Sequence, residues 1–197
     1  MYHFRYKHED SLHWLYSQFD AIHPLSSPCK AYLAEVLEEH SFDQGEKLLR
    51  ANAPCKKLHF VVDGILHSYV SDGVDERTTW IFLEGSMCLS PESFFMGVPS
   101  KESIATLEPC LLYALSSTDL KKIERMFPEF QCVMSGYVQR AFFATGACLA
   151  AFRSLNAEGR CKWLAQTHPE WFDRAPHKCL ADFVGIDKAH FSRIRKR

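Results

Sequence analysis

Polar and basic side chains gather at the C-terminal end of the chain, where their types suit contact with a polyanion. The planar guanidinium of an arginine can donate two parallel hydrogen bonds to guanine, and lysine and arginine also bind phosphates. The charge balance supports this interpretation, because residues 151–197 hold ten Lys/Arg and five Asp/Glu within a chain of net charge −1. The candidate nucleic-acid contacts are Lys188, Ala189, His190, Ser192, Arg193, Arg195, Lys196 and Arg197.

The spacing just before these residues predicts a helix-turn-helix. Ala181 is small enough for two helices to cross, Gly185 can adopt the positive φ that the turn needs, and Asp187 can cap the second helix. The second helix would then present Lys188 and Arg193 near its start, where a recognition helix contacts base edges. We expect Arg193 to read a base, and the basic residues after it to hold phosphates. The alternative is a helical hairpin that packs on its own domain and leaves a solvated basic end. In the predicted helix-turn-helix, the two helices would share a small core of Leu180, Val184, Ile186, Phe191 and Ile194.

The middle of the chain, from Ser41 to Ser116, has the pattern of a β-domain. Short runs rich in β-formers alternate with turn residues, and Asp63-Gly64 and Asp72-Gly73 are hairpin signals. Many short strands with regular turns favour a jelly roll. The expected strands are 47–50, 58–62, 65–70, 78–83, 103–107 and 110–115.

Helices are expected on both sides of this β-domain. We predict helices over residues 9–23, from an N-cap at Ser27 and from an N-cap at Thr118, and a long helix over 128–151. Small residues line one side of the long helix, which is either an ordinary core face or a dimer seam. That side carries Val133, Tyr137, Ala141, Ala144, Cys148 and Ala151.

The chain as a whole resembles the Crp/Fnr superfamily, in particular its shorter members. The resembling segments are 60–64, 78–85, 93–95, 99–108, 181–186 and 191–195, in order along nearly the full length. The resemblance implies an α+β fold, with an N-terminal jelly-roll or β-roll sensor domain and flanking helices, a long dimerisation helix and a C-terminal helix-turn-helix. We place the domains at residues 1–150 and 151–197.

The resemblance also implies partners and contact residues. It implies a homodimer that binds palindromic promoter sites in double-stranded DNA and that can meet RNA polymerase there. Lys188, Ala189 and Arg193 stand where the superfamily's base-contacting residues lie. Ala189 departs from the Glu common at that position, so we expect a different operator. The C-terminal wing of longer members has no counterpart after the predicted recognition helix.

The effector site departs further from the superfamily pattern. Nucleotide-binding members use a Gly-Glu pair and a later Arg-Ser pair, and neither pair is intact here. The residues in the corresponding stretch are Ser90, Glu92, Ser93 and Lys101. Lys101 could hold a phosphate only as a point charge, and Glu102 beside it would repel one. We therefore expect no cofactor and no tight binding of cyclic AMP, while an unknown small-molecule effector stays open.

Other classes of protein fit the sequence less well. The cysteines are scattered without metal-ligand spacing, and we expect them to be reduced and buried. His59 and His67 are interpreted as strand-surface residues rather than haem ligands. A metal-dependent cupin-type enzyme would need a His-x-His-type pair in the β-region, and none occurs there. We expect a cytoplasmic protein that is not an enzyme and has no membrane span. A ligand-binding β-roll whose helix-turn-helix has lost DNA affinity is the second hypothesis.

Overall fold

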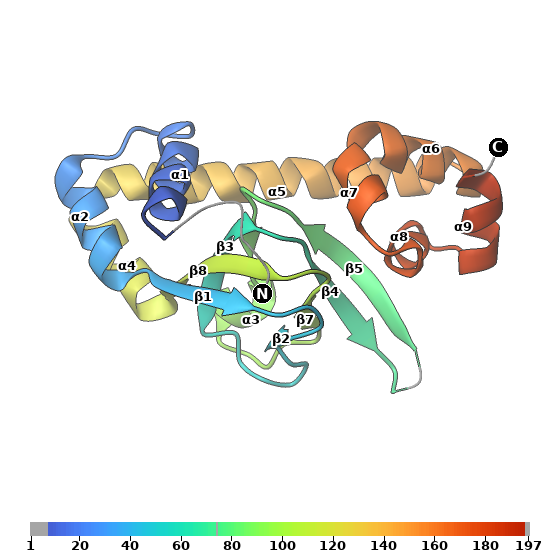
Figure 1. Ribbon diagram of the computed structural model, residues 1–197, viewed down its shortest axis with the longest axis horizontal. Coiled ribbons are helices and arrows are strands. Elements are labelled where there is room, and N and C mark those ends of the chain that lie inside the picture. Colours follow the sequence, from blue (N-terminus) through green and yellow to red (C-terminus); the bar gives the residue numbers. More distant parts are fainter. Residues whose placement is uncertain (1–7, 74, 196–197) are drawn as a thin grey trace.

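The computed structural model describes residues 8–73 and 75–195, in which helices lie at both ends of a β-roll (Figure 1). The helices are α1 (His8–Asp20), α2 (Ser27–Val36), α3 (Pro91–Met96), α4 (Ser117–Met126), α5 (Pro128–Ser154), α6 (Ala157–Thr167), α7 (Pro169–Arg174), α8 (His177–Val184) and α9 (Lys188–Arg195). The strands are β1 (Glu38–Phe42), β2 (Lys47–Leu49), β3 (Lys57–Asp63), β4 (Leu66–Ser71), β5 (Glu76–Phe82), β6 (Met87–Cys88), β7 (Ser103–Thr106) and β8 (Cys110–Ser116). The predicted α+β class and the order of its parts are confirmed.

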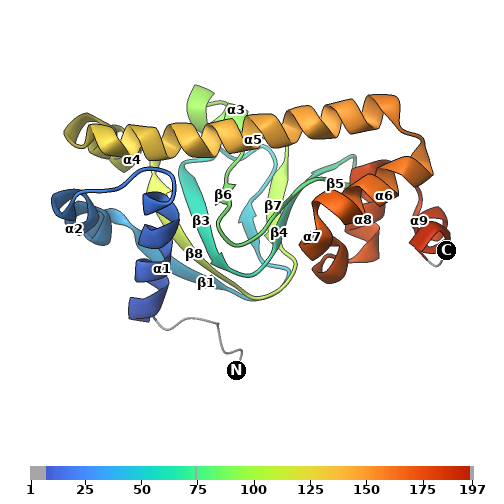
Figure 2. The ribbon, with the colours of Figure 1, turned by 90° about the horizontal axis from the view of Figure 1, so that it is seen from above.

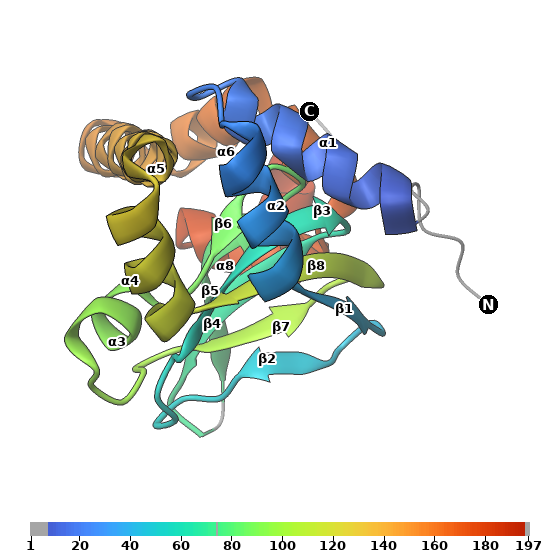
Figure 3. The same ribbon diagram turned by 90° about the vertical axis from the view of Figure 1, so that its left-hand side faces the viewer.

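The strands form two antiparallel sheets, each four-stranded over the described residues. One has the order β1-β8-β3-β6 and the other β2-β7-β4-β5. Figure 3 shows the two sheets one above the other, with α1 lying over the sheet that contains β3 and β8. The prediction missed two strands, because β1 begins before Ser41 and β6 is only two residues long.

One of the two predicted Asp-Gly hairpins is wrong. Asp72-Gly73 joins β4 to β5, which pair with each other, but Asp63-Gly64 carries the chain from β3 into the other sheet. Gly64 has a φ of +104°, and a Cβ built on it would lie 2.5 Å from the Cys110 Sγ. A side chain at this position is therefore excluded both by the backbone conformation and by the close approach of β8.

Aromatic side chains join α1 and α5 to the first sheet. The ring of Phe19 packs edge-on against Phe60 of β3 and Phe130 of α5, with centroid distances of 4.8 and 5.8 Å. Tyr137 of α5 completes this group, 5.5 Å from Phe60. These contacts fix the N-terminal half of α5 on the β-roll.

The 27-residue helix α5 runs from the β-roll to the C-terminal helices (Figure 2). On the side that the sequence left open as a core face or a dimer seam, Val133, Tyr137, Cys148 and Ala151 are buried within the chain. Ala141 on the same side is exposed, and Ala144 is half-buried. A different side of the helix carries large exposed apolar residues. Val138, Phe142 and Leu149 lie on this side, and Phe143 is exposed about 100° further around the helix.

The C-terminal helices share a hydrophobic core with the second sheet. Ile81 of β5 is buried in the same cluster as Leu180 and Phe183 of α8. Trp80, also on β5, lies edge-on to Trp171 and Phe183 at 5.5 and 5.9 Å between centroids. The predicted boundary at residue 150/151 falls inside α5, and the two parts on either side of it pack against each other.

Two helix starts differ from their predicted positions by one and two residues. Ser26, rather than Ser27, caps α2 by accepting a hydrogen bond from the amide of Cys29 at 3.3 Å. Ser116, rather than Thr118, caps α4 by accepting from the amide of Asp119 at 3.0 Å. In both cases a neighbouring hydroxyl residue has the extended backbone that an N-cap requires.

Candidate DNA-binding and effector sites

The turn between α8 and α9 has the geometry that the sequence predicted. Gly185 has a φ of +72°, its amide donates to the carbonyl of Asp182, and the amide of Ile186 donates to Ala181. This pair of bonds is the Schellman motif, which ends a helix at a left-handed residue. Ala181 is buried where the helices cross. Asp187 then opens α9 by accepting a 2.8 Å hydrogen bond from the amide of His190.

Helix α9 buries one side and exposes the predicted recognition side. Phe191 is buried against the neighbouring helices, whereas Lys188, Ala189 and Arg193 are exposed. His190 and Ser192 are half-buried and flank that surface. Of the other predicted contacts, the side chain of Arg195 and the whole of Lys196 and Arg197 lie outside the described residues.

Ion pairs that the sequence analysis missed fix the C-terminal helices to the β-roll. Arg174, at the end of α7, makes a two-pronged contact with Glu84 at 2.9 and 3.0 Å, and it also contacts Glu108. Burial raises the pKa of Glu84, but the hydrogen bonds and charge of Arg174, together with the amide of Gly64, outweigh it and leave that pKa below its usual value. Separations of 90 and 66 residues give no pattern from which these pairs could be found.

Lys178 adds a second link at the start of α8. Its ammonium donates to the backbone carbonyl of Glu76 on β5 at 2.7 Å and pairs with Asp182 at 3.0 Å. The first helix of the motif is thus held to a strand of the β-roll by the Lys178 side chain.

His67 lies at this junction, half-buried rather than on an open strand surface. Its ring stacks on Tyr69 at 4.9 Å, its Nδ1 is 3.1 Å from the Thr78 hydroxyl, and the Cys179 Sγ is 3.9 Å away. Burial lowers the pKa of His67 to about 4. The imidazole is therefore neutral near pH 7.

Of the four predicted effector residues, two are buried in the fold and two lie on the surface. Ser93 is buried, accepts a hydrogen bond from the Cys55 amide and donates to the carbonyl of Val98. Ser90 is also buried, and its hydroxyl accepts from that of Ser100 at 3.0 Å. Glu92 and Lys101 pair with each other on the surface at 2.7 Å. The hydroxyls thus serve the fold, and the one cation has a protein partner.

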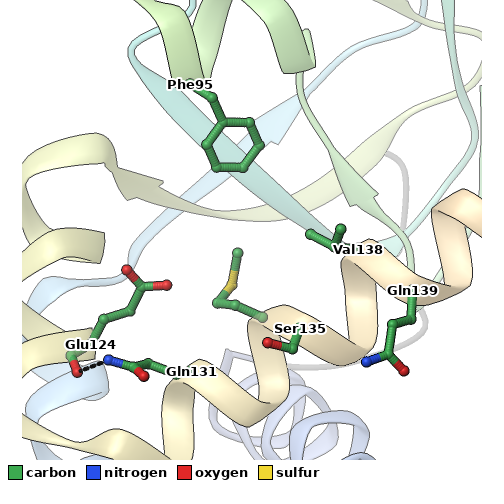
Figure 4. A pocket seen from close by; sticks show the side chains of 7 residues that line it. Phe95, Glu124, Gln131, Ser135, Val138 and Gln139 are labelled. Atoms are coloured by element: carbon green, nitrogen blue, oxygen red, sulfur yellow. Dashed lines mark hydrogen bonds between the residues drawn. The ribbon is translucent and has the colours of Figure 1, made fainter.

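A groove lies instead between α3, α4 and α5 (Figure 4). It has a volume of about 480 Å³ and combines apolar with amide and hydroxyl side chains. Figure 4 shows Phe95 of α3 facing Val138 of α5 across it. Its lining residues are Phe95, Glu124, Gln131, Met134, Ser135, Val138 and Gln139.

Metal and membrane features are both absent from the described part of the chain. No cluster of three or more His, Cys, Asp or Glu side chains there could hold a metal ion. Seven of the eight cysteines are buried as free thiols, and Cys132 is exposed. None of the helices within residues 8–73 and 75–195 is both long and apolar enough to span a bilayer.

Comparison with known proteins agrees with this architecture. Residues 39–125 match the family model for the cyclic nucleotide-binding domain. No curated protein sequence matches the chain. The β-roll is therefore similar in sequence to a cyclic nucleotide-binding domain over these residues.

Solved structures extend the likeness to most of the chain. The c-di-GMP-responsive global regulator CLP from Xanthomonas campestris superposes with a TM-score of 0.68 at 14% identity, covering 87% of this chain and 90% of its own. A Crp/Fnr-family regulator from Eubacterium rectale gives 0.66 at 16% identity, with coverage of 87% and 82%. FixK2 from Bradyrhizobium japonicum gives 0.65 at 16%, with coverage of 82% and 83%. The chain thus has the fold of Crp/Fnr transcription regulators.

Proposed function

We propose that this protein is a sequence-specific DNA-binding transcription regulator of the Crp/Fnr type that acts as a homodimer. The observation that carries the proposal is the exposed side of α9, where Lys188, Ala189 and Arg193 follow directly on a glycine turn and an aspartate cap. The first residues of such a helix contact base edges in the major groove. The Crp/Fnr fold supports the same interpretation.

Dimerisation would use the exposed side of α5. Ser135, Val138, Phe142, Thr145 and Leu149 follow one another at spacings of three and four, which is the repeat of a coiled-coil seam. Phe142 is 73% exposed and Leu149 58%, so a partner helix would bury a large apolar area here. A parallel pair of α5 helices places two copies of α9 about a twofold axis, which suits a palindromic site.

A charge placed in the seam tests this arrangement. Phe142→Asp should convert the dimer to a monomer in analytical ultracentrifugation at micromolar concentration. Phe143→Asp is the matched control, because Phe143 is 68% exposed but lies off the seam repeat. Equal effects of the two substitutions, or a wild-type protein that sediments as a monomer, would contradict the proposed seam.

Sequence reading by α9 is tested with duplexes selected from a random DNA library. Arg193→Ala should lower affinity for the selected duplex by about 1–3 kcal/mol and relax preference at one base pair per half-site. Affinity for a scrambled duplex should change much less. An equal loss on both duplexes would make Arg193 a phosphate contact. If selection enriches no sequence and no duplex binds, the second hypothesis, a β-roll without DNA affinity, takes its place.

We also propose that the β-roll does not bind cyclic AMP tightly. The support is that Ser90 and Ser93 are engaged in internal hydrogen bonds and that Lys101 is paired with Glu92. Isothermal titration calorimetry should detect no binding at micromolar protein. An affinity in the micromolar range or better would contradict this proposal.

A further inference from the structure

Arg160, in the first turns of α6, is a half-buried cation with no hydrogen bond or ion pair to the residues that the structure describes. Its Nε is fully buried, and its guanidinium lies over the ring of Phe152 at 5.8 Å from the centroid. The ring limits the positions that the guanidinium can take, as stacked arginines generally show. By contrast, Lys162 on the same helix pairs with Glu158 at 2.8 Å.

The guanidinium lies at the turn of the helix-turn-helix. Its Nη1 is 3.6 Å from the point that a Cβ on Gly185 would occupy. Gly185 ends α8, and α9 begins three residues later at Lys188. Helix α6 also packs against both α8 and α9. Arg160 therefore belongs to the same end of the motif as the first residues of the recognition helix.

We propose that Arg160 binds a phosphate of the DNA backbone at the edge of the major groove that α9 enters. The inference rests on the proposed DNA-binding function and adds a contact outside the recognition helix. The major groove is about 12 Å wide, so the start of an inserted helix lies close to the flanking phosphates. A guanidinium already held by an aromatic ring loses little freedom on binding, and its Nη atoms suit a phosphate oxygen pair.

A phosphate contact has a distinct signature in the salt dependence of binding. Each contact contributes about 0.9 to the slope of log K against log salt concentration. Arg160→Met keeps the aliphatic stem and removes the charge, so it should lower that slope by about this amount. Between 50 and 200 mM salt, the affinity ratio of wild type to variant should then shrink about 3.5-fold. Because a phosphate carries no sequence information, the loss should be equal on selected and scrambled duplexes.

The experiment titrates wild type, Arg160→Met, Arg160→Lys and Lys162→Met against both duplexes at several salt concentrations. Arg160→Lys keeps the charge and should keep the slope, which a purely structural role would not predict. Lys162→Met is the control and should leave the slope unchanged, because Lys162 has a partner on its own helix. An unchanged slope in Arg160→Met, or a loss confined to the selected duplex, would overturn the inference alone. If the wild type bound neither duplex, the proposed function would fail, and this inference with it.

Discussion

The contact of Arg174 with Glu84 and Glu108 gives the sharpest test of how the two parts of the chain are joined. The side chains of Arg174 and Glu84 are 29% and 13% exposed, so this is neither an exposed surface pair nor a fully buried one. Exposed ion pairs contribute about 0–1 kcal/mol to the free energy of unfolding, whereas removing one partner of a buried pair lowers it by about 3–5 kcal/mol. Arg174→Met keeps the apolar stem and leaves two neighbouring carboxylates without their cation. We expect it to lower the free energy of unfolding by about 2–3 kcal/mol at pH 7.

The loss of stability in Arg174→Met should depend on pH, and the contacts of Glu84 give the direction of that dependence. In the wild type the pKa of Glu84 is lowered, so its stabilisation is complete above the ordinary glutamate pKa and is lost as pH falls through the lowered value. Without Arg174, burial and the charge of Glu108 would raise the pKa of Glu84, so the variant should gain stability as pH falls from 7 towards 5. The difference between the two proteins should therefore shrink with acidification.

Urea unfolding at pH 7 and pH 5, followed by tryptophan fluorescence, measures both effects. Trp80 and Trp171 lie on opposite sides of the junction and report on its integrity. Lys101→Met is the control, since it removes an ion pair that is 78% and 57% exposed and should change stability little. An Arg174→Met protein as stable as the wild type at pH 7 would refute the reasoning, because the contact would then provide no net stabilisation.

Four further substitutions test three single features of the fold by urea unfolding. The hydroxyl of Tyr137 is buried without a hydrogen-bond partner among the described residues, so Tyr137→Phe should raise stability by about 1 kcal/mol, and a loss would reveal a partner. Gly64→Ala should cost about 3 kcal/mol, because a positive φ and the contact with Cys110 both oppose a Cβ, and a neutral result would contradict the close approach. Ser116→Ala should cost about 1 kcal/mol as the loss of an N-cap, whereas Thr118→Ala should cost little, and the reverse order would restore the sequence-based prediction.

Local features of the helix-turn-helix were predictable because neighbouring residues determine them. The positive φ at Gly185, the cap at Asp187 and the burial of Phe191 all follow from residue types at short spacing. The long helix was predicted for the same reason, since Pro128 begins it and an apolar repeat continues it. The caps at Ser26 and Ser116 were misplaced because adjacent hydroxyl residues compete for the same role.

Only the tertiary structure determined which segments of the chain pack or hydrogen-bond with one another. Asp63-Gly64 looks like a hairpin turn in sequence, but whether the chain stays in one sheet or crosses to the other depends on which strands pair. The apolar side of α5 that contains Val133 and Tyr137 could be a core face or a dimer seam in sequence, and the tertiary structure buries these two residues within the chain. Ser90 and Ser93 likewise became internal hydrogen-bonding groups once the β-roll placed Ser100 and Cys55 beside them.

The sequence by itself determined most of the elements, the order of the two parts and the face of α9 that meets solvent. Periodicity, capping and glycine conformation act over a few residues, and a single chain contains that information in readable form. Only the tertiary structure determined how the C-terminal helices pack on the β-roll, where Arg174 pairs with carboxylates 66 and 90 residues away. It also determined that Arg160 lies beside the turn at Gly185. Contacts between residues so far apart depend on how whole helices and strands pack, and short sequence patterns do not determine that packing.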